Sequence, residues 1–183
     1  IRGCDVGRIE SCGLVEERYP DWSPDGDRIV FLRTVQDVRG GPWVNTSLVI
    51  RDLKTDDETT VAVPGLDVDE LDWSPDGRRI AYVTERTLEV VDLHANTTDT
   101  LVDLDTAETG FDSSFDQIRH PRFTPDGTAV IVGINQTDGA GTAVRRDPWV
   151  AWLDGRPIEP LFPTPTAENE RGFYTRISLQ PVP

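Results

Sequence analysis

The sequence of 183 residues contains no methionine, only two cysteines and two histidines, and a single lysine, Lys54. It has no run of about 18 apolar residues, so it predicts no membrane-spanning helix. Acidic residues outnumber basic residues by 33 to 18, which leaves a formal net charge of −15. Because a surface this acidic repels phosphate backbones, the composition argues against nucleic acid as a partner.

Patterns that indicate catalysis or metal binding are also scarce. The two histidines are His94 and His120, and no Gly-x-Ser-x-Gly segment provides the strained turn of a serine nucleophile. The aspartate pairs at 67–69 and 103–105 lack the loop spacing of a calcium site. The glycine-containing segment 138–143 lacks the Lys-Ser/Thr of a phosphate-binding loop. We therefore expect a chain that is not an enzyme and holds neither metal nor cofactor.

One eight-residue pattern occurs three times, as YPDWSPDG at 19–26, ELDWSPDG at 70–77 and HPRFTPDG at 120–127. In each copy proline presets φ at the first corner of a turn, and aspartate accepts hydrogen bonds from nearby backbone N–H groups. Glycine then adopts φ > 0 without steric cost. We expect nine structural turn residues: Pro24, Asp25, Gly26, Pro75, Asp76, Gly77, Pro125, Asp126 and Gly127.

Apolar runs after each turn predict strands that are buried on both faces, at 28–32, 79–83 and 128–132. Third strands are expected at 47–53, 88–93 and 149–155, and fourth strands at 59–63, 99–104 and 157–162. Four antiparallel strands in each period of about fifty residues indicate the blades of an all-β propeller. A β-sandwich is the alternative, but it gives no reason for the same turn to recur at equal spacing.

The segments PDWSPDGDRIVF and LDWSPDGRRIAYV resemble the TolB-type propeller repeat, which also occurs in the propeller domains of prolyl-oligopeptidase-like peptidases. The third copy departs from this pattern at Phe123, which replaces tryptophan, and at Thr124, which replaces serine. The resemblance extends from residue 16 to about residue 166 and implies a structural role for the Trp-Ser-Pro-Asp-Gly residues. It is specific for the fold and does not identify a ligand.

The period divides the chain into parts of one repeat domain over residues 1–183. We expect complete blades at 18–66, 67–116 and 117–166, with 1–17 ending a preceding blade and 167–183 beginning a following one. TolB-like propellers have six blades, so one interpretation is that these blades form part of a larger propeller. The alternatives are self-association and a four-bladed ring closed by the two ends.

The function that we expect from the resemblance is a non-catalytic module that binds a protein partner in the cell envelope or the extracellular space. One alternative is the substrate-gating propeller of a prolyl-oligopeptidase-like serine peptidase, separated from its catalytic domain. Another is an architectural subunit of a larger assembly.

The expected binding face is the one opposite the Pro-Asp-Gly turns, because the long segments 35–46, 105–119 and 136–148 lie there. Aromatic and arginine side chains anchor protein interfaces. The candidates on these segments are therefore Trp43, Phe111, Phe115, Arg145 and Arg146. The alternative for Phe111 and Phe115 is that they only hold their own loops in place.

Three of the four asparagines lie in sequons for N-glycosylation, namely Asn45, Asn96 and Asn135. We expect all three at strand ends or in loops, where a transferase reaches them. A glycan on Asn45 or Asn135 would crowd the expected partner face.

The two cysteines, Cys4 and Cys12, are symmetric about Arg8 in an expected hairpin between the third and fourth strands of the preceding blade. Residues that face each other across a hairpin have a separation that suits a disulfide. An even cysteine count in an extracytoplasmic chain supports the same pairing. Lipid attachment at Cys4 and a pair of reduced thiols remain the alternatives.

Overall fold

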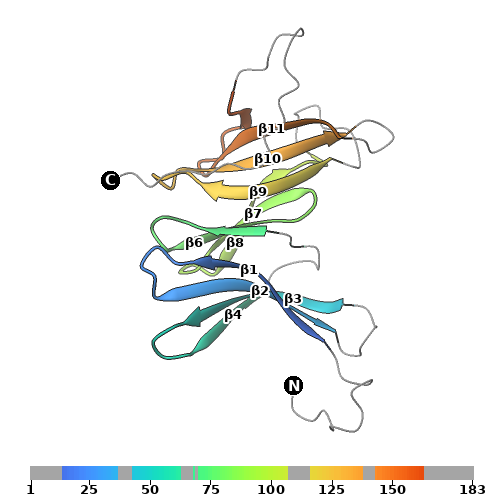
Figure 1. The fold of residues 1–183 in the computed structure, drawn as a ribbon. Helices are drawn as coiled ribbons and strands as arrows, with labels where there is room; N and C mark the ends of the chain where they lie inside the picture. The colour runs from blue at the N-terminus through green and yellow to red at the C-terminus, as the bar shows by residue number, and fades with distance from the viewer. Residues whose placement is uncertain are drawn as a thin grey trace. The chain divides into compact units, whose positions relative to one another are not determined.

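The structure is a computed structural model that describes residues 14–36, 43–62, 68, 70–106, 116–137 and 143–162. These residues form three separate four-stranded antiparallel sheets, which confirms the expected all-β fold made of propeller blades (Figure 1). The chain divides into two compact units, Ile1–Val68 with the first blade and Asp69–Pro183 with the second and third. The described part of the chain contains no helix long and apolar enough to cross a membrane.

Each blade is a meander in which consecutive strands pair. The strands of the first blade are β1 (Val15–Trp22), β2 (Arg28–Gln36), β3 (Trp43–Asp52) and β4 (Glu58–Ala62). Those of the second are β5 (Glu70–Trp73), β6 (Arg79–Val83), β7 (Thr87–Asp92) and β8 (Thr97–Asp103). Those of the third are β9 (Gln117–Phe123), β10 (Ala129–Thr137), β11 (Ala143–Trp152) and β12 (Glu159–Pro160).

The repeated turn has the same hydrogen bonds in every blade. In the first blade Ser23 Oγ donates to Asp25 Oδ1 at 2.5 Å and accepts the backbone N–H of Arg28 at 2.9 Å. Asp25 Oδ1 also accepts the N–H of Asp27 at 3.0 Å, and Gly26 has a φ of 73°. The Ser23 hydroxyl, followed by the Asp27 N–H, holds the pKa of Asp25 below its ordinary value. Thus serine or threonine and aspartate together close a turn whose third corner requires glycine.

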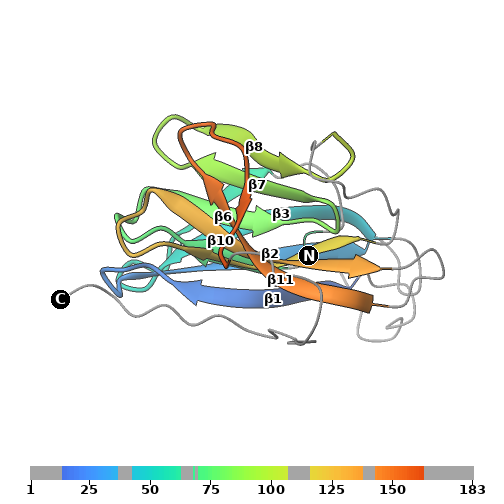
Figure 2. The same ribbon diagram turned by 90° about the horizontal axis from the view of Figure 1, so that it is seen from above.

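The middle hairpins of the first and third blades are longer than expected. Pairing of β2 with β3 continues to Gln36 opposite Trp43, and pairing of β10 with β11 continues to Thr137 opposite Ala143 (Figure 2). The expectation of loops over 35–46 and 136–148 was therefore wrong for the described ends of these segments. The apolar runs stop before the strands do, because polar side chains such as Thr34 pair across the ladder instead.

The first strand also begins earlier than expected. Val15, Glu16 and Glu17 pair with β2, whereas we had placed residues up to 17 in a preceding blade. The hairpin expected around Cys4 and Cys12 placed residues 11–15 at the start of the fourth strand of the preceding blade, and for Val15 this was wrong because Val15 pairs with Val35 of β2. Both cysteines lie outside the described residues, so the disulfide stays a prediction.

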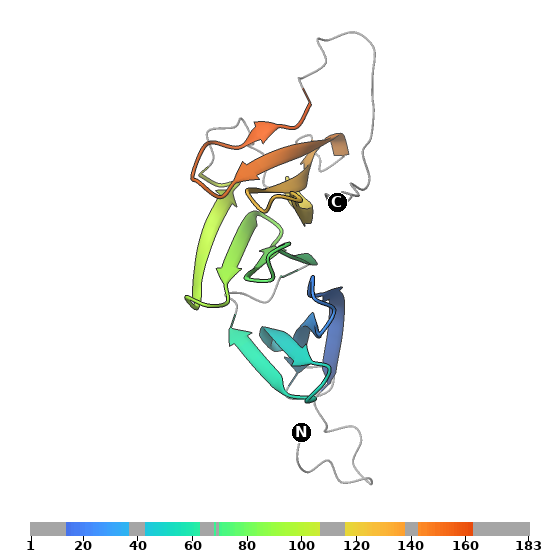
Figure 3. The same cartoon turned by 90° about the vertical axis from the view of Figure 1, so that its left-hand side faces the viewer.

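The second and third blades share an apolar core. Their sheets pack face to face, as the green and orange ribbons of Figure 3 show. Phe123, at the end of β9, lies in one buried cluster with side chains from both blades. The cluster includes Ala81, Val83, Leu88, Val90, Val130, Val132, Ile134 and Ala151.

Candidate functional site

The first strands of the second and third blades, β5 and β9, carry polar side chains that meet across the two blades. The repeat aligns Glu70 with His120 and Asp72 with Arg122, fifty positions apart. Each pair therefore consists of an acidic and a basic residue at the same repeat position. We refer to Glu70, Asp72, His120 and Arg122 as the first-strand site.

His120 has a backbone conformation that L-residues rarely adopt, with a φ of 54°. It lies in a β-bulge, because the pairing of β9 with β10 shifts between Arg119 and Arg122. Pro121 follows, and a proline disfavours the right-handed helical region for the residue before it. Tyr19, at the same place in β1, also has a φ of 54° and precedes a proline. The second blade has Glu70 here, followed by Leu71 and an unshifted ladder.

Glu70 provides the hydrogen bonds that the bulge in β9 requires. Its Oε2 atom accepts the backbone N–H of His120 at 3.0 Å and contacts the ring Nδ1 at 2.8 Å. The Nδ1–H tautomer satisfies this acceptor. One carboxylate thus fixes both the backbone and the imidazole of a strained residue on the neighbouring blade.

Asp72 makes the second connection between the blades. Its Oδ2 atom accepts the backbone N–H of Phe123 at 2.7 Å, and its Oδ1 atom accepts from Arg122 Nη1 at 3.0 Å. The same Nη1 also donates to the carbonyl of Pro121 at 2.9 Å. Charge-assisted bonds of this kind are shorter and stronger than neutral ones, so Asp72 holds Arg122 in one orientation.

The first-strand site retains hydrogen-bonding capacity after these contacts. Within the described residues, His120 Nε2 makes no hydrogen bond, and neither do Nε and Nη2 of Arg122. The side chains of His120 and Arg122 are 44% and 34% exposed. An imidazole nitrogen and a guanidinium edge that are both fixed in place can recognise a carboxylate or a peptide carbonyl. The described side-chain partner of His120 is Glu70, and its described hydrogen bonds include no serine, threonine or cysteine.

Three of the five expected partner-binding residues are described by the structure, and all three lie in strands. Trp43 is the first residue of β3, opposite Gln36. Arg145 and Arg146 belong to β11, opposite Gln136 and Asn135. Phe111 and Phe115 lie outside the described residues, so no position is assigned to them.

The sequons differ in their surroundings. Asn96 lies in the turn between β7 and β8 and is exposed. Asn45 lies in β3 opposite Val35, and Asn135 lies in β10 between Gln117 and Arg146. Asn96 thus lies in a turn, and Asn45 and Asn135 are each the third residue from an end of a strand.

The sequence reasoning did not identify Glu70, Asp72 or Arg122, and it considered His120 only as a catalytic candidate. The repeat contained a partial signal, because it aligns an acidic residue with a basic one at both positions, although the alignment does not specify which acid contacts which base. In the part of the chain that the structure describes, no three His, Cys, Asp or Glu side chains cluster as metal ligands.

No family model matches the chain, and no curated protein matches it. Several solved structures do, among them TolB from Acinetobacter baumannii, with 17% identity and a TM-score of 0.56 over 82% of this chain and 33% of that one. An acylaminoacyl peptidase from Pyrococcus horikoshii matches with 17% identity and a TM-score of 0.54, over 80% of this chain and 25% of the peptidase. The tricorn protease matches with 14% identity and a TM-score of 0.52, over 85% and 18%.

At these identities the similarity shows the fold and nothing further. The chain spans a third or less of the length of each of these three proteins. The three sheets resemble the blades of the TolB and peptidase propellers, and the chain is an all-β protein built from propeller blades.

Proposed function

We propose that this chain is a non-catalytic propeller module that binds a partner protein outside the cytoplasm. The observation that carries the proposal is the first-strand site, where two acids of β5 fix His120 and Arg122 of β9 and leave their outer nitrogens available. A rigid group binds with a smaller entropic cost than a mobile one. These contacts therefore favour recognition of an acidic or carbonyl-bearing segment of a partner.

The acidic composition of the chain makes a fixed cation at this site more important for binding an acidic partner. With a net charge of −15, the chain repels an acidic partner over most of its surface. Contact with such a partner then depends on the few places where a cation is held in a fixed orientation. Arg122 is one of these places.

Photo-crosslinking in the native host tests this function. A benzophenone amino acid at Gln117, on β9 just before His120, is expected to give a discrete adduct with one host protein. The same probe at the exposed Arg78, beside a Pro-Asp-Gly turn, serves as the matched control. Equal adducts from both positions would contradict the proposal.

Two further variants make the test specific. His120→Asn removes the imidazole but tolerates a positive φ, and Arg122→Gln removes the cation. Both are expected to reduce the Gln117 adduct at least about tenfold, which corresponds to the loss of a charge-assisted contact. Circular dichroism verifies that each variant is folded. An unchanged adduct in both would overturn the role of this site.

The second candidate is the propeller of a serine peptidase, because two of the similar structures are peptidases with TM-scores close to that of TolB. The native protein would then carry a hydrolase domain on the same polypeptide. Labelling of native material with a fluorophosphonate probe, together with its intact mass, distinguishes the two. A labelled protein much heavier than 20.4 kDa would favour the peptidase.

A further inference from the structure

We propose that Asn96 is the acceptor of an N-linked glycan, and that Asn45 and Asn135 are not acceptors in the folded chain. The inference uses the proposed location outside the cytoplasm, but it does not involve the first-strand site. All three asparagines have a hydroxyl residue two positions later, so the sequence does not distinguish them. The structure does distinguish them.

Asn96 occupies a turn position that leaves its side chain without a structural task. Asp92 closes the turn, since its Oδ1 atom accepts the N–H groups of His94 and Ala95, both at 2.8 Å. These two N–H groups also hold the pKa of Asp92 below its ordinary value. The backbone of Asn96 donates to the Asp92 carbonyl and has a φ of 55°. The side-chain amide of Asn96 is exposed and makes no hydrogen bond to a described residue.

The first blade contains the same turn with a different residue at this place. Asp52 accepts the N–H groups of Lys54 and Thr55, and Asp56 has a φ of 65°. The turn therefore requires a residue that tolerates a left-handed conformation, and asparagine and aspartate both do so. Nothing in the turn requires the amide itself, which leaves its nitrogen available for modification.

The three sequons differ most clearly in the hydroxyl residue that lies two positions after each asparagine. Thr98, two positions after Asn96, is exposed on β8, and its hydroxyl makes no hydrogen bond to a described residue. Ser47, which follows Asn45, is buried. Thr137, which follows Asn135, donates its hydroxyl to Asp116 Oδ1 at 3.1 Å, and the same oxygen accepts its N–H at 2.8 Å. The Asn96 sequon thus presents an exposed amide together with an exposed hydroxyl, whereas the hydroxyl residue of each other sequon is buried or hydrogen-bonded.

Strand position also distinguishes Asn96 from Asn135. A transferase must draw the acceptor segment into its own site, which requires local opening of the chain. Asn96 precedes β8, which is the edge strand of its sheet and pairs only with β7. Asn135 lies in β10, which pairs with both β9 and β11. Opening at Asn135 disrupts two ladders, whereas opening at Asn96 disrupts the end of one.

The reaction is a group transfer from a polyprenyl-pyrophosphate-linked oligosaccharide. The Asn96 amide nitrogen forms a bond to the anomeric carbon, and the bond from that carbon to the pyrophosphate oxygen breaks. The pyrophosphate leaves with the electron pair, and a basic group of the transferase takes the amide proton. No oxidant or reductant is needed.

Transfer to folded and to unfolded chain tests this inference. The acceptor is purified protein, incubated with a single-subunit oligosaccharyltransferase that accepts the bare sequon and with a short fluorescent lipid-linked oligosaccharide. In the folded chain we expect modification of Asn96, at a rate at least about tenfold above that of either other site, which corresponds to about 1.4 kcal/mol of additional opening cost. In tryptic peptides from the same protein we expect all three sites to be modified, which shows that each sequon is competent.

Two variants serve as matched controls. Thr98→Val keeps the shape and the β-preference of the side chain and removes the hydroxyl. Asn96→Asp gives the turn the residue that the first blade already has. Both are expected to abolish transfer to the folded chain and to leave its unfolding midpoint unchanged.

Peptide mapping by mass spectrometry of native-host material completes the test. A glycan on Asn96 alone supports the inference. Modification of folded chain at Asn45 or Asn135 as fast as at Asn96, or native material with a bare Asn96, would overturn it. Because the crosslinking experiment above does not use Asn96, failure of one test does not imply failure of the other.

Discussion

Trp22 and Phe123 occupy the same position in the first and third blades, directly before the Ser/Thr-Pro-Asp-Gly turn, yet their surroundings differ. Trp22 is 59% exposed, whereas Phe123 is 5% exposed. Trp22 lies opposite Ile29 in β2, and Phe123 lies opposite Val130 in β10. The two aromatic residues therefore mark the same face of two equivalent sheets.

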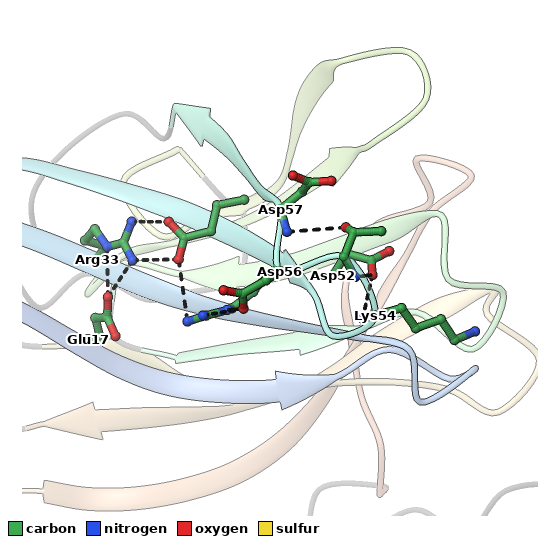
Figure 4. A network of polar contacts seen from close by, with 9 residues as sticks. Glu17, Arg33, Asp52, Lys54, Asp56 and Asp57 are labelled. Atoms are coloured by element: carbon green, nitrogen blue, oxygen red, sulfur yellow. Dashed lines mark hydrogen bonds and ion pairs between the residues drawn. The ribbon is translucent and has the colours of Figure 1, made fainter.

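Residues further along this face also differ. In β10 the face continues with Val132 and Ile134, which are both fully buried against the second blade. In β2 Arg33 stands in the place of Ile134. Its guanidinium donates to Glu17 at 2.6 Å, as Figure 4 shows. It also donates to Glu58 at 2.7 Å. The hydrogen bond to Glu58 contributes most, and that to Glu17 adds to it, in raising the pKa of Arg33 above its ordinary value.

The difference shows that the repeat specifies the strands and the turn, whereas the residues between them specify what covers each face. An aliphatic face is stable only when another apolar face covers it. A face of paired charges around an aromatic ring remains stable in water. Interchanging residues between the two faces therefore tests the comparison directly.

The largest effect is expected from Ile134→Arg. This change places a guanidinium without a partner in a fully buried cluster, and we expect the free energy of unfolding of the second unit to fall by about 4 kcal/mol or more. The reverse change, Arg33→Ile, removes partly exposed ion pairs and is expected to cost about 1 kcal/mol or less. Urea unfolding followed by circular dichroism measures both. Equal costs would contradict the comparison.

A smaller difference is expected between Phe123→Ala and Trp22→Ala. Truncation of Phe123 leaves a cavity between the second and third blades and is expected to cost about 3–5 kcal/mol. Truncation of Trp22 removes a side chain that is mostly in solvent, and the expected cost is about 1 kcal/mol. The same unfolding measurement applies. A cost for Trp22 as large as that for Phe123 would show that Trp22 is covered in solution.

The fold was predictable because its signals are local. Turn chemistry at Pro24-Asp25-Gly26 and its two copies, together with the apolar runs, predicted twelve strands in three blades, and the structure contains them. The polar ends of the long hairpins were not predictable from hydrophobicity. There β2 and β3 continue through pairs such as Thr34 with Thr46, which have no apolar alternation.

The first-strand site could not be predicted from the sequence, because its contacts are not local. Its residues are fifty positions apart and become neighbours only when two blades pack, and the bulge at His120 is a property of the backbone. The sequence contained the acid at Glu70 and the base at Arg122, but it did not specify which acid contacts which base. Non-local pairing of this kind depends on how the blades pack.

The Ser/Thr-Pro-Asp-Gly turns occur in both the first and the third blade, and we expect acid to destabilise them in the same way. The pKa of Asp25 is lowered by Ser23 and Asp27, and that of Asp126 by Thr124 and Thr128, from an ordinary value of 3.8. A lowered pKa means that the folded state favours the carboxylate. Its contribution to stability is thus complete above the ordinary pKa and is lost as the pH falls through the folded pKa.

We therefore expect the urea midpoint to fall between about pH 5 and pH 2. A variant with Asp25→Asn, Asp76→Asn and Asp126→Asn keeps an acceptor oxygen in each turn but does not titrate there. Its midpoint is expected to depend less on pH over this range. An identical pH dependence of the two proteins would show that other carboxylates determine the acid response.

The smallest effect is expected at Tyr82, which occupies in β6 the position of Phe31 in β2 and of Val132 in β10. Its side chain is fully buried, and in the described part of the chain its hydroxyl has no hydrogen-bond partner. Burial, and then the charge of Glu89, raise the pKa of this hydroxyl. Tyr82→Phe removes a buried polar group that lacks a partner, so the free energy of unfolding is expected to rise by about 1 kcal/mol. Tyr19→Phe, at an exposed tyrosine of β1, is the matched control and is expected to change it little. A loss of stability in Tyr82→Phe would show instead that the hydroxyl is hydrogen-bonded in solution. The second blade would then differ from the other two at this position by a stabilising polar contact.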